Sequence, residues 1–202
     1  MPRVLLTGFG SFPNVPINPC VEVVQRIQEH SILLQEANIF LHTEILSVSY
    51  RRSIEELECL LQEPYDIRIH LGVANSTDHI RLEQFAYNIC GQGKDVDGEI
   101  RVGKPIVDAV PTTHVWSSTM EQTQLQNLSQ HFWAKGIPVH LSSDPGRYVC
   151  NNIYAHSLHT ADTSKVLFVH IPNPSNSDIW SIATIHAVVE ELILWLSTEI
   201  SV

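Results

Sequence analysis

The sequence predicts an α/β fold: a three-layer α/β/α sandwich with a mostly parallel, mixed central sheet, built as one domain over residues 1–202. Short apolar runs rich in β-branched residues alternate with segments whose apolar residues recur at helical spacing. Several of the short runs are apolar throughout, as in strands that helices cover on both faces. Because 44% of the 202 residues are hydrophobic, the chain can bury a substantial core.

The first part of the chain alternates regularly between strand-like and helix-like segments. The run VLLTGF at 4–9 is typical of a buried strand. A helix is predicted at 18–30, because Asn18 is a favourable N-cap and Pro19 suits the first turn. The same periodicities predict a strand at 39–49, a helix at 53–63 and a strand at 66–73.

A long irregular segment interrupts the alternation in the second part. The run IRLEQFAYN at 80–88 is strand-like, and the polar, glycine-rich segment 91–111 reads as a long excursion with room for a small hairpin. Long ordered loops in compact domains are often functional. The remaining predicted elements are a helix at 119–135, a strand at 137–142, a helix at 147–158, a strand at 165–172 and a helix at 178–198.

Charge and hydropathy exclude several classes of partner. The formal net charge is −10 with only 12 Lys and Arg residues, so the chain has no basic surface suited to nucleic acid or to an anionic membrane. No stretch approaches the roughly 20 consecutive apolar residues of a membrane span. The N-terminus enters a strand directly, without the architecture of a signal peptide, which predicts a cytoplasmic protein.

The chain contains four cysteines, Cys20, Cys59, Cys90 and Cys150. They show no CxxC spacing and are too few for a disulfide framework, so we expect reduced thiols. Cys150 stands out because it follows an Asp-Pro-Gly turn and lies in the first turn of the helix predicted at 147–158. The free amides and dipole at a helix start can stabilise a thiolate and form an oxyanion hole. The alternative is that Cys150 is simply a small buried residue.

Two further residues could complete a catalytic site with Cys150. His170 lies near the end of the apolar strand at 165–172, and ligand sites of parallel sheets gather at such strand ends. Glu83 is an acid inside the apolar run at 80–88. A nucleophilic cysteine needs a base, and the base needs a group that orients its imidazole. Ordinary structural roles remain open: a hydrogen-bonded histidine, and a solvent-facing glutamate on an alternating strand.

Four motifs occur in one order over nearly the whole chain: VLLTGFGSFPNVPINP, LEQFAYN, SSDPGRYVCN and VLFVHIP. In this order they resemble the motifs of the pyroglutamyl peptidase I family, cysteine omega-peptidases that remove an N-terminal pyroglutamate from peptides. The cysteine motif is the most specific of the four. The resemblance implies that Cys150 is the nucleophile, His170 the general base and acid, and Glu83 the residue that orients His170. The substrate-binding candidates are Phe9, Phe12, Gly72 and Val149.

The resemblance also implies a mechanism and a set of partners. Thiolate attack on the carbonyl after pyroglutamate would form a thioester acyl-enzyme, which water then hydrolyses. Because the lactam ring is flat and neutral, it suits an apolar slot with a few hydrogen bonds. No metal or organic cofactor is expected. The expected partners are peptides with an N-terminal pyroglutamate and further copies of the chain, in a dimer or tetramer.

Some positions depart from the pattern of many bacterial family members. Val73 occupies a position where those members have Gln, and Gln84 follows Glu83 where they have Arg. An Arg expected near Gly93 has no obvious counterpart. These departures keep open an alternative function, that of a catalytically weak or silent relative that binds pyroglutamyl peptides or another small ligand.

Two other functional classes have weaker support in the sequence. A metal-assisted hydrolase is suggested by 11 histidines, but the nearest approach to a ligand pair is His156 with His159, and no HExxH motif is present. A dinucleotide-binding role is disfavoured because TGFGSF lacks the third glycine of the GxGxxG fingerprint.

Overall fold

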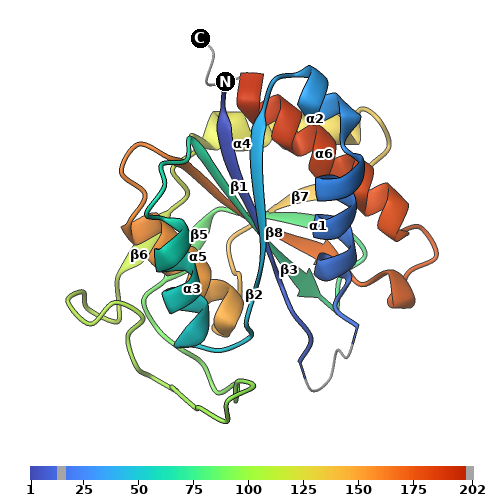
Figure 1. Ribbon diagram of the computed structural model, residues 1–202. Coiled ribbons are helices and arrows are strands. Elements are labelled where there is room, and N and C mark those ends of the chain that lie inside the picture. Colours follow the sequence, from blue (N-terminus) through green and yellow to red (C-terminus); the bar gives the residue numbers. More distant parts are fainter. Residues whose placement is uncertain (13–16, 199–202) are drawn as a thin grey trace.

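A central sheet between two layers of helices forms the body of the molecule, as seen in a computed structural model that describes residues 1–12 and 17–198 (Figure 1). The strands are β1 (Arg3–Phe9), β2 (Phe40–Leu46), β3 (Ile67–Ala74), β4 (Ile80–Glu83), β5 (Phe85–Tyr87), β6 (Val115–Ser117), β7 (Val139–Ser142) and β8 (Lys165–Pro172). The helices are α1 (Pro19–His30), α2 (Ile32–Glu36), α3 (Arg52–Leu60), α4 (Gln122–Trp133), α5 (Val149–His159) and α6 (Ile182–Thr198), with a short 3-10 helix at Pro174–Asn176.

The sheet is mixed, with a parallel majority. Within the described residues its order is β2-β1-β3-β8-β4-β7. Strands β2, β1, β3 and β8 run parallel to one another, whereas β4 is antiparallel to β8 and parallel to β7. The predicted α/β fold with a mostly parallel, mixed sheet is therefore confirmed. The reversal at β4 matters for function because it brings the end of β4 alongside the middle of β8.

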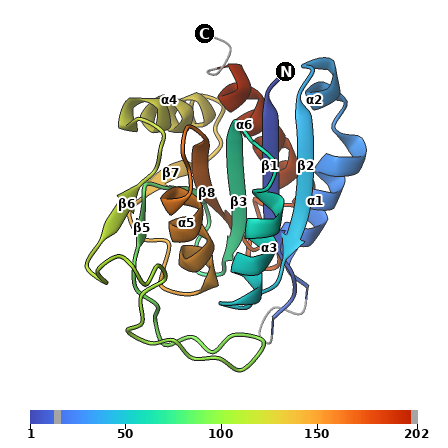
Figure 2. The same ribbon diagram turned by 60° about the vertical axis from the view of Figure 1, so that its left-hand side comes forward.

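Helices cover both faces of the sheet, as Figures 1 and 2 show. One apolar core lies under α1, α4 and α6, and a second lies under α3 and α5. Because side chains alternate along a strand, β1 sends Val4 and Leu6 into the first core and Leu5 and Phe9 into the second. The first core is mostly aliphatic but also contains Phe132 and Trp180, and the second contains the residues around Cys150.

Several elements differ from the expectation. The run 80–88 is not one strand: it breaks at Gln84, whose backbone bonds Ser142 and Ser118, and continues as β5. Strand β5 pairs with the unpredicted β6 in a separate two-stranded ribbon that packs on α5. The short helix α2 was also not expected, and β2 ends earlier than predicted. The segment 91–111 is irregular, with an antiparallel bridge between Lys94 and Ile100.

None of the helices in the described part of the chain combines the length and the apolar character needed to cross a bilayer.

Candidate active site

Cys150 is the second residue of α5, so the prediction that it lies in a first helical turn is confirmed. The N-cap residue, Tyr148, makes no side-chain hydrogen bond to this turn. The first backbone N–H groups of a helix have no carbonyl acceptor within the helix, and here the N-cap side chain does not accept a hydrogen bond from them. Cys150 is partly exposed. The thiol therefore lies beside backbone N–H groups that have no carbonyl acceptor within the helix and can donate hydrogen bonds to an incoming anion.

Buried asparagines fix the start of α5 against its neighbours. The side chain of Asn151 accepts a hydrogen bond from the backbone N–H of Tyr87 at 2.9 Å and donates one to the carbonyl of Tyr87 at 2.8 Å. Asn152 donates to the carbonyl of Tyr50 at 2.9 Å. Both asparagines are fully buried. Because hydrogen bonds are directional, these contacts fix where the first turn of α5, and hence Cys150, lies.

Strand β3 contacts α5 along most of the length of the helix. Arg68 donates to the carbonyl of Thr160 at 3.0 Å, at the helix C-terminus. The buried ring of His70 lies 2.9 Å through Nε2 from Oγ of Ser157 and 2.8 Å through Nδ1 from Oγ1 of Thr7. Burial, with the charge of Arg68, lowers the pKa of His70 to about 3. His70 is therefore neutral at physiological pH and serves as a two-sided hydrogen-bonding link between β1, β3 and α5.

Gly72, two residues further along β3, leaves the space that the thiol occupies. A Cβ atom built on Gly72 would lie 2.9 Å from Sγ of Cys150 and 2.8 Å from the ring of Phe168. Gly72 also pairs with His170 in the β3–β8 register. The thiol is thus packed against the strand that borders His170, and any side chain at position 72 would displace it.

His170 and Glu83 meet across the antiparallel β4–β8 pair. Arg81 lies directly opposite His170, and Glu83 follows two residues later on the same face. Oε1 of Glu83 lies 2.8 Å from Nδ1 of His170, and the two side chains are buried. The alternative that Glu83 faces solvent is wrong, because its exposed fraction is 0%. Tyr154 of α5 donates its hydroxyl hydrogen to the carbonyl of Glu83 at 2.7 Å.

The protonation of His170 reflects opposing effects. Burial disfavours the charged imidazolium, but the hydrogen bonds and charges of Cys150 and Glu83 outweigh burial and raise the pKa of His170 to about 9. Because Glu83 occupies Nδ1, Nε2 is the ring nitrogen available for proton exchange with a reacting group. At neutral pH the imidazole of His170 can therefore carry the proton while it interacts with the Cys150 thiol on one side and the Glu83 carboxylate on the other.

A cavity of about 720 Å³ opens beside the start of α5. It is lined by Phe12, Tyr148 and the segment Gly93–Gly98. Phe12, Tyr148 and Cys150 all pack against the same core, the one under α3 and α5. Of the predicted substrate-binding residues, the structure brings Phe12 to this cavity. Phe9 and Val149 are 4% and 1% exposed and lie in the core beneath it.

The sequence did not predict that Tyr148 and the segment Gly93–Gly98 line this cavity. The available signal was the polar, glycine-rich composition of residues 91–111, which marked a functional loop without showing where it lies. Gly93 has no room for a Cβ atom because the ring of Tyr148 covers it. Contact between these two residues, 55 positions apart in the chain, is a product of the fold.

The departures at Val73 and Gln84 lie away from the cavity. Val73 packs against the core under α1, α4 and α6, on the opposite face of the sheet from Gly72. Gln84 lines a separate hollow of about 260 Å³ with Phe85 and with residues between the end of β6 and the first turn of α4. Neither residue lines the cavity beside Tyr148.

The histidine pair considered as metal ligands has other neighbours. His156 lies 3.2 Å from Glu58, and the ring of His159 meets Trp116 edge-to-face at 5.8 Å between ring centroids. Within residues 1–12 and 17–198, no group of three or more His, Cys, Asp or Glu side chains is arranged to hold a metal ion.

Comparisons with known proteins agree with the resemblance seen in the motifs. The family profile described as pyroglutamyl peptidase matches residues 2–187. The pyrrolidone-carboxylate peptidase of Pyrococcus furiosus is 31% identical over 176 residues, covering 84% of this chain and 80% of that protein. That of Oceanobacillus iheyensis is 31% identical over 179 residues, covering 85% and 84%. The crystal structure of the pyrrolidone carboxyl peptidase of Fervidobacterium islandicum AW-1 superposes with a TM-score of 0.86 at 30% identity, covering 98% of this chain and 99% of that one. The chain therefore belongs to the pyroglutamyl peptidase family of cysteine peptidases.

Proposed function

We propose that this chain hydrolyses the peptide bond that follows an N-terminal pyroglutamate, with Cys150, His170 and Glu83 as its catalytic group. The observation that carries the proposal is the environment of His170, which interacts with Glu83 at Nδ1 and with Cys150 at the start of α5. A thiol beside a base, with a carboxylate that orients the base, is the arrangement of an activated cysteine nucleophile. Membership of the family supports the class of substrate.

In the acylation step, Sγ of Cys150 attacks the carbonyl carbon that joins pyroglutamate to the next residue. The amides of the first turn of α5 donate hydrogen bonds to the oxyanion that forms. The C–N bond then breaks, and the imidazolium of His170 gives its proton to the leaving amine. A thioester between Cys150 and the pyroglutamyl group remains, and the shortened peptide departs.

In the deacylation step, neutral His170 takes a proton from a water molecule, whose oxygen attacks the thioester carbonyl. The C–S bond breaks, which releases pyroglutamic acid and returns the thiolate beside the imidazolium. Glu83 keeps Nδ1 protonated through both steps and stabilises the positive charge each time it forms on the ring.

The cavity suits a substrate of this kind. Pyroglutamate has no N-terminal ammonium, so its site needs no carboxylate to grip the amine, and a flat neutral ring can lie against aromatic side chains. Phe12 and Tyr148 provide such side chains in a cavity of about 720 Å³. The volume exceeds that of one lactam ring, which leaves space for residues that follow pyroglutamate.

The decisive experiment is to incubate the reduced protein with a pyroglutamyl-coumarin amide and follow the release of fluorescence. Cys150→Ser should lower kcat/KM by at least roughly a thousandfold, because a hydroxyl replaces the nucleophilic thiolate. Cys59→Ser is the matched control, since Cys59 is an exposed thiol of α3. A prolyl-coumarin amide, which has a basic ring nitrogen in place of the lactam, should not be cleaved.

Selective alkylation gives an independent check. Burial raises the pKa of the thiols of Cys20 and Cys90, so neither should react quickly. Loss of activity should follow modification of Cys150 and should be slowed by 2-pyrrolidone. Activity that survives Cys150→Ser would refute the nucleophile. Pyroglutamyl-peptide binding without turnover by the folded, reduced protein would favour the silent relative.

A further inference from the structure

We propose that Asp95 is a positioning residue that holds the wall of the cavity, the segment Gly93–Gly98, in the shape that binds substrate. The inference rests on the proposed function and adds a residue that determines how tightly the substrate is bound. Asp95 touches neither the thiol nor the imidazole in the described structure, so we expect it to act through the backbone of the segment.

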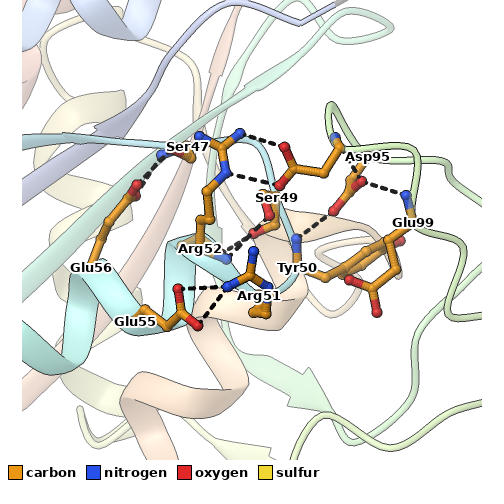
Figure 3. Close-up of polar contacts among 11 residues, drawn as sticks. Ser47, Ser49, Tyr50, Arg51, Arg52, Glu55, Glu56, Asp95 and Glu99 are labelled. Carbon is orange, nitrogen blue, oxygen red and sulfur yellow. Dashed lines mark hydrogen bonds and ion pairs between the residues drawn. The ribbon is translucent and has the colours of Figure 1, made fainter.

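The side chain of Asp95 is a buried carboxylate that accepts hydrogen bonds from three backbone N–H groups. Those of Asp97 and Glu99 reach Oδ1 at 3.0 and 2.8 Å, which closes the segment on itself. The N–H of Tyr50, before α3, reaches Oδ2 at 2.9 Å and ties the segment to the body of the protein. Figure 3 shows Asp95 between Tyr50 and Glu99. Asp95 is 3% exposed and forms no salt bridge with another described residue, so these backbone amides are the groups that its carboxylate contacts directly.

Two tyrosine hydroxyl groups hold the backbone just before Asp95. Tyr50 donates to the carbonyl of Gly93 at 3.0 Å, and Tyr148 donates to the carbonyl of Lys94 at 2.9 Å. The two rings meet edge-to-face, with centroids 5.6 Å apart. Because Tyr148 precedes α5 and lies two residues before Cys150, these contacts connect the segment to the start of the catalytic helix.

The second acid of the segment has a different position. Asp97 forms an ion pair with Arg52 at 2.8 Å, but the two side chains are 39% and 41% exposed. Exposed ion pairs contribute little to the free energy of folding, whereas buried hydrogen bonds to a carboxylate contribute more. Asp95, rather than Asp97, therefore determines the conformation of the wall.

The test is the variant Asp95→Asn, which preserves the shape of the side chain. In the variant, an NH₂ group replaces one of the two carboxylate oxygens and cannot accept a hydrogen bond. A backbone N–H that donates to that oxygen in the wild-type protein then faces another donor. A hydrogen bond to a charged group is worth roughly a tenfold change or more in an equilibrium constant, so KM for the pyroglutamyl-coumarin amide should rise about tenfold or more. We expect kcat to change less than about threefold, because Cys150, His170 and Glu83 stay in place.

Asp108→Asn is the matched control, because Asp108 is an exposed acid on the same 91–111 excursion. It should leave KM and kcat unchanged. Iodoacetamide is small enough to react with Cys150 without binding against the segment Gly93–Gly98. Its alkylation of Cys150 should therefore proceed at the wild-type rate in Asp95→Asn. An unchanged KM, or equal falls in kcat and in the rate of alkylation, would overturn the proposal.

Hydrogen exchange makes the inference testable apart from the proposed function. Amides of residues 93–99 should exchange at least about tenfold faster in Asp95→Asn, while those of α5 should not change. If the wild-type protein fails to cleave the substrate, the proposed function fails, and the exchange rates still decide whether Asp95 holds the segment. If Asp95→Asn does not fold, Tyr148→Phe removes only the bond to Lys94, and an unchanged KM in that variant would also overturn the proposal.

Discussion

Replacing Gly72 with Ala adds one methyl group where the structure has no room for it. The new Cβ would lie 2.8 Å from two ring atoms of Phe168 and 2.9 Å from Sγ of Cys150. Non-bonded carbon atoms prefer a separation of about 3.5–4.0 Å, so neighbouring atoms must move by up to roughly 1 Å. Phe168 is fully buried, between the rings of His170 and Tyr154 at centroid distances of 4.8 and 5.7 Å. The partly exposed Cys150 side chain is therefore the group that we expect to move.

Two effects should follow from the Gly72→Ala substitution. Extra volume in a well-packed core costs about 1–3 kcal/mol in the free energy of unfolding. A displacement of about 1 Å at the reacting atom costs on the order of a hundredfold in rate. We therefore expect kcat for the pyroglutamyl-coumarin amide to fall about a hundredfold in a protein that is still folded at 25 °C.

Gly8→Ala separates these two effects. A Cβ at Gly8 would lie 3.1 Å from Cβ of Cys20 and from a methyl group of Val24, in the core on the opposite face of the sheet. Gly8→Ala should lower stability in urea unfolding without a hundredfold loss of kcat. Wild-type kcat in folded Gly72→Ala, or equal losses in the two variants, would refute the reasoning.

Two other substitutions test the electrostatics and the packing of the site. Glu83→Gln removes the carboxylate that favours the imidazolium of His170, so the pKa of His170 should fall from about 9, and the alkaline limb of kcat/KM should move to lower pH. A limb that stays in place would show that the charge of Glu83 does not act on His170. Ser157→Ala leaves Nε2 of buried His70 without its partner, which should cost about 1–3 kcal/mol in urea unfolding. A cost below about 0.5 kcal/mol would show that this link does not help to hold α5.

The raised pKa of His170 also makes the stability of the folded protein depend on pH. Because the pKa of His170 rises from its ordinary value of 6.5 to about 9 on folding, the native state binds this proton more tightly than the unfolded state. The resulting stabilisation is fully present below pH 6.5 and is lost as the pH rises through about 9. Neutral His70 acts in the opposite direction, because its low pKa costs stability as the pH falls below about 6.5.

Local patterns were sufficient for most of the fold. Helical spacing and capping residues predicted α1, and continuous apolar runs predicted β1, β3 and β8 close to their observed bounds. The direction of β4 and β7 was not predictable, because periodicity describes which face of a strand is buried and not which way its neighbours run. The break at Gln84 was missed for a related reason: the two halves of the run 80–88 are equally strand-like but pair with different partners.

The sequence by itself determined which residues are candidates for chemistry and that Cys150 lies in the first turn of a helix. The tertiary structure decided which candidates meet. Glu83 lies 87 positions from His170 and reaches it because β4 runs antiparallel to β8. Asp95 meets Tyr50, 45 positions away, because the long excursion folds back against the residues at the start of α3. Such contacts depend on how distant segments pack and pair, and a local pattern of residue types carries no record of that pairing.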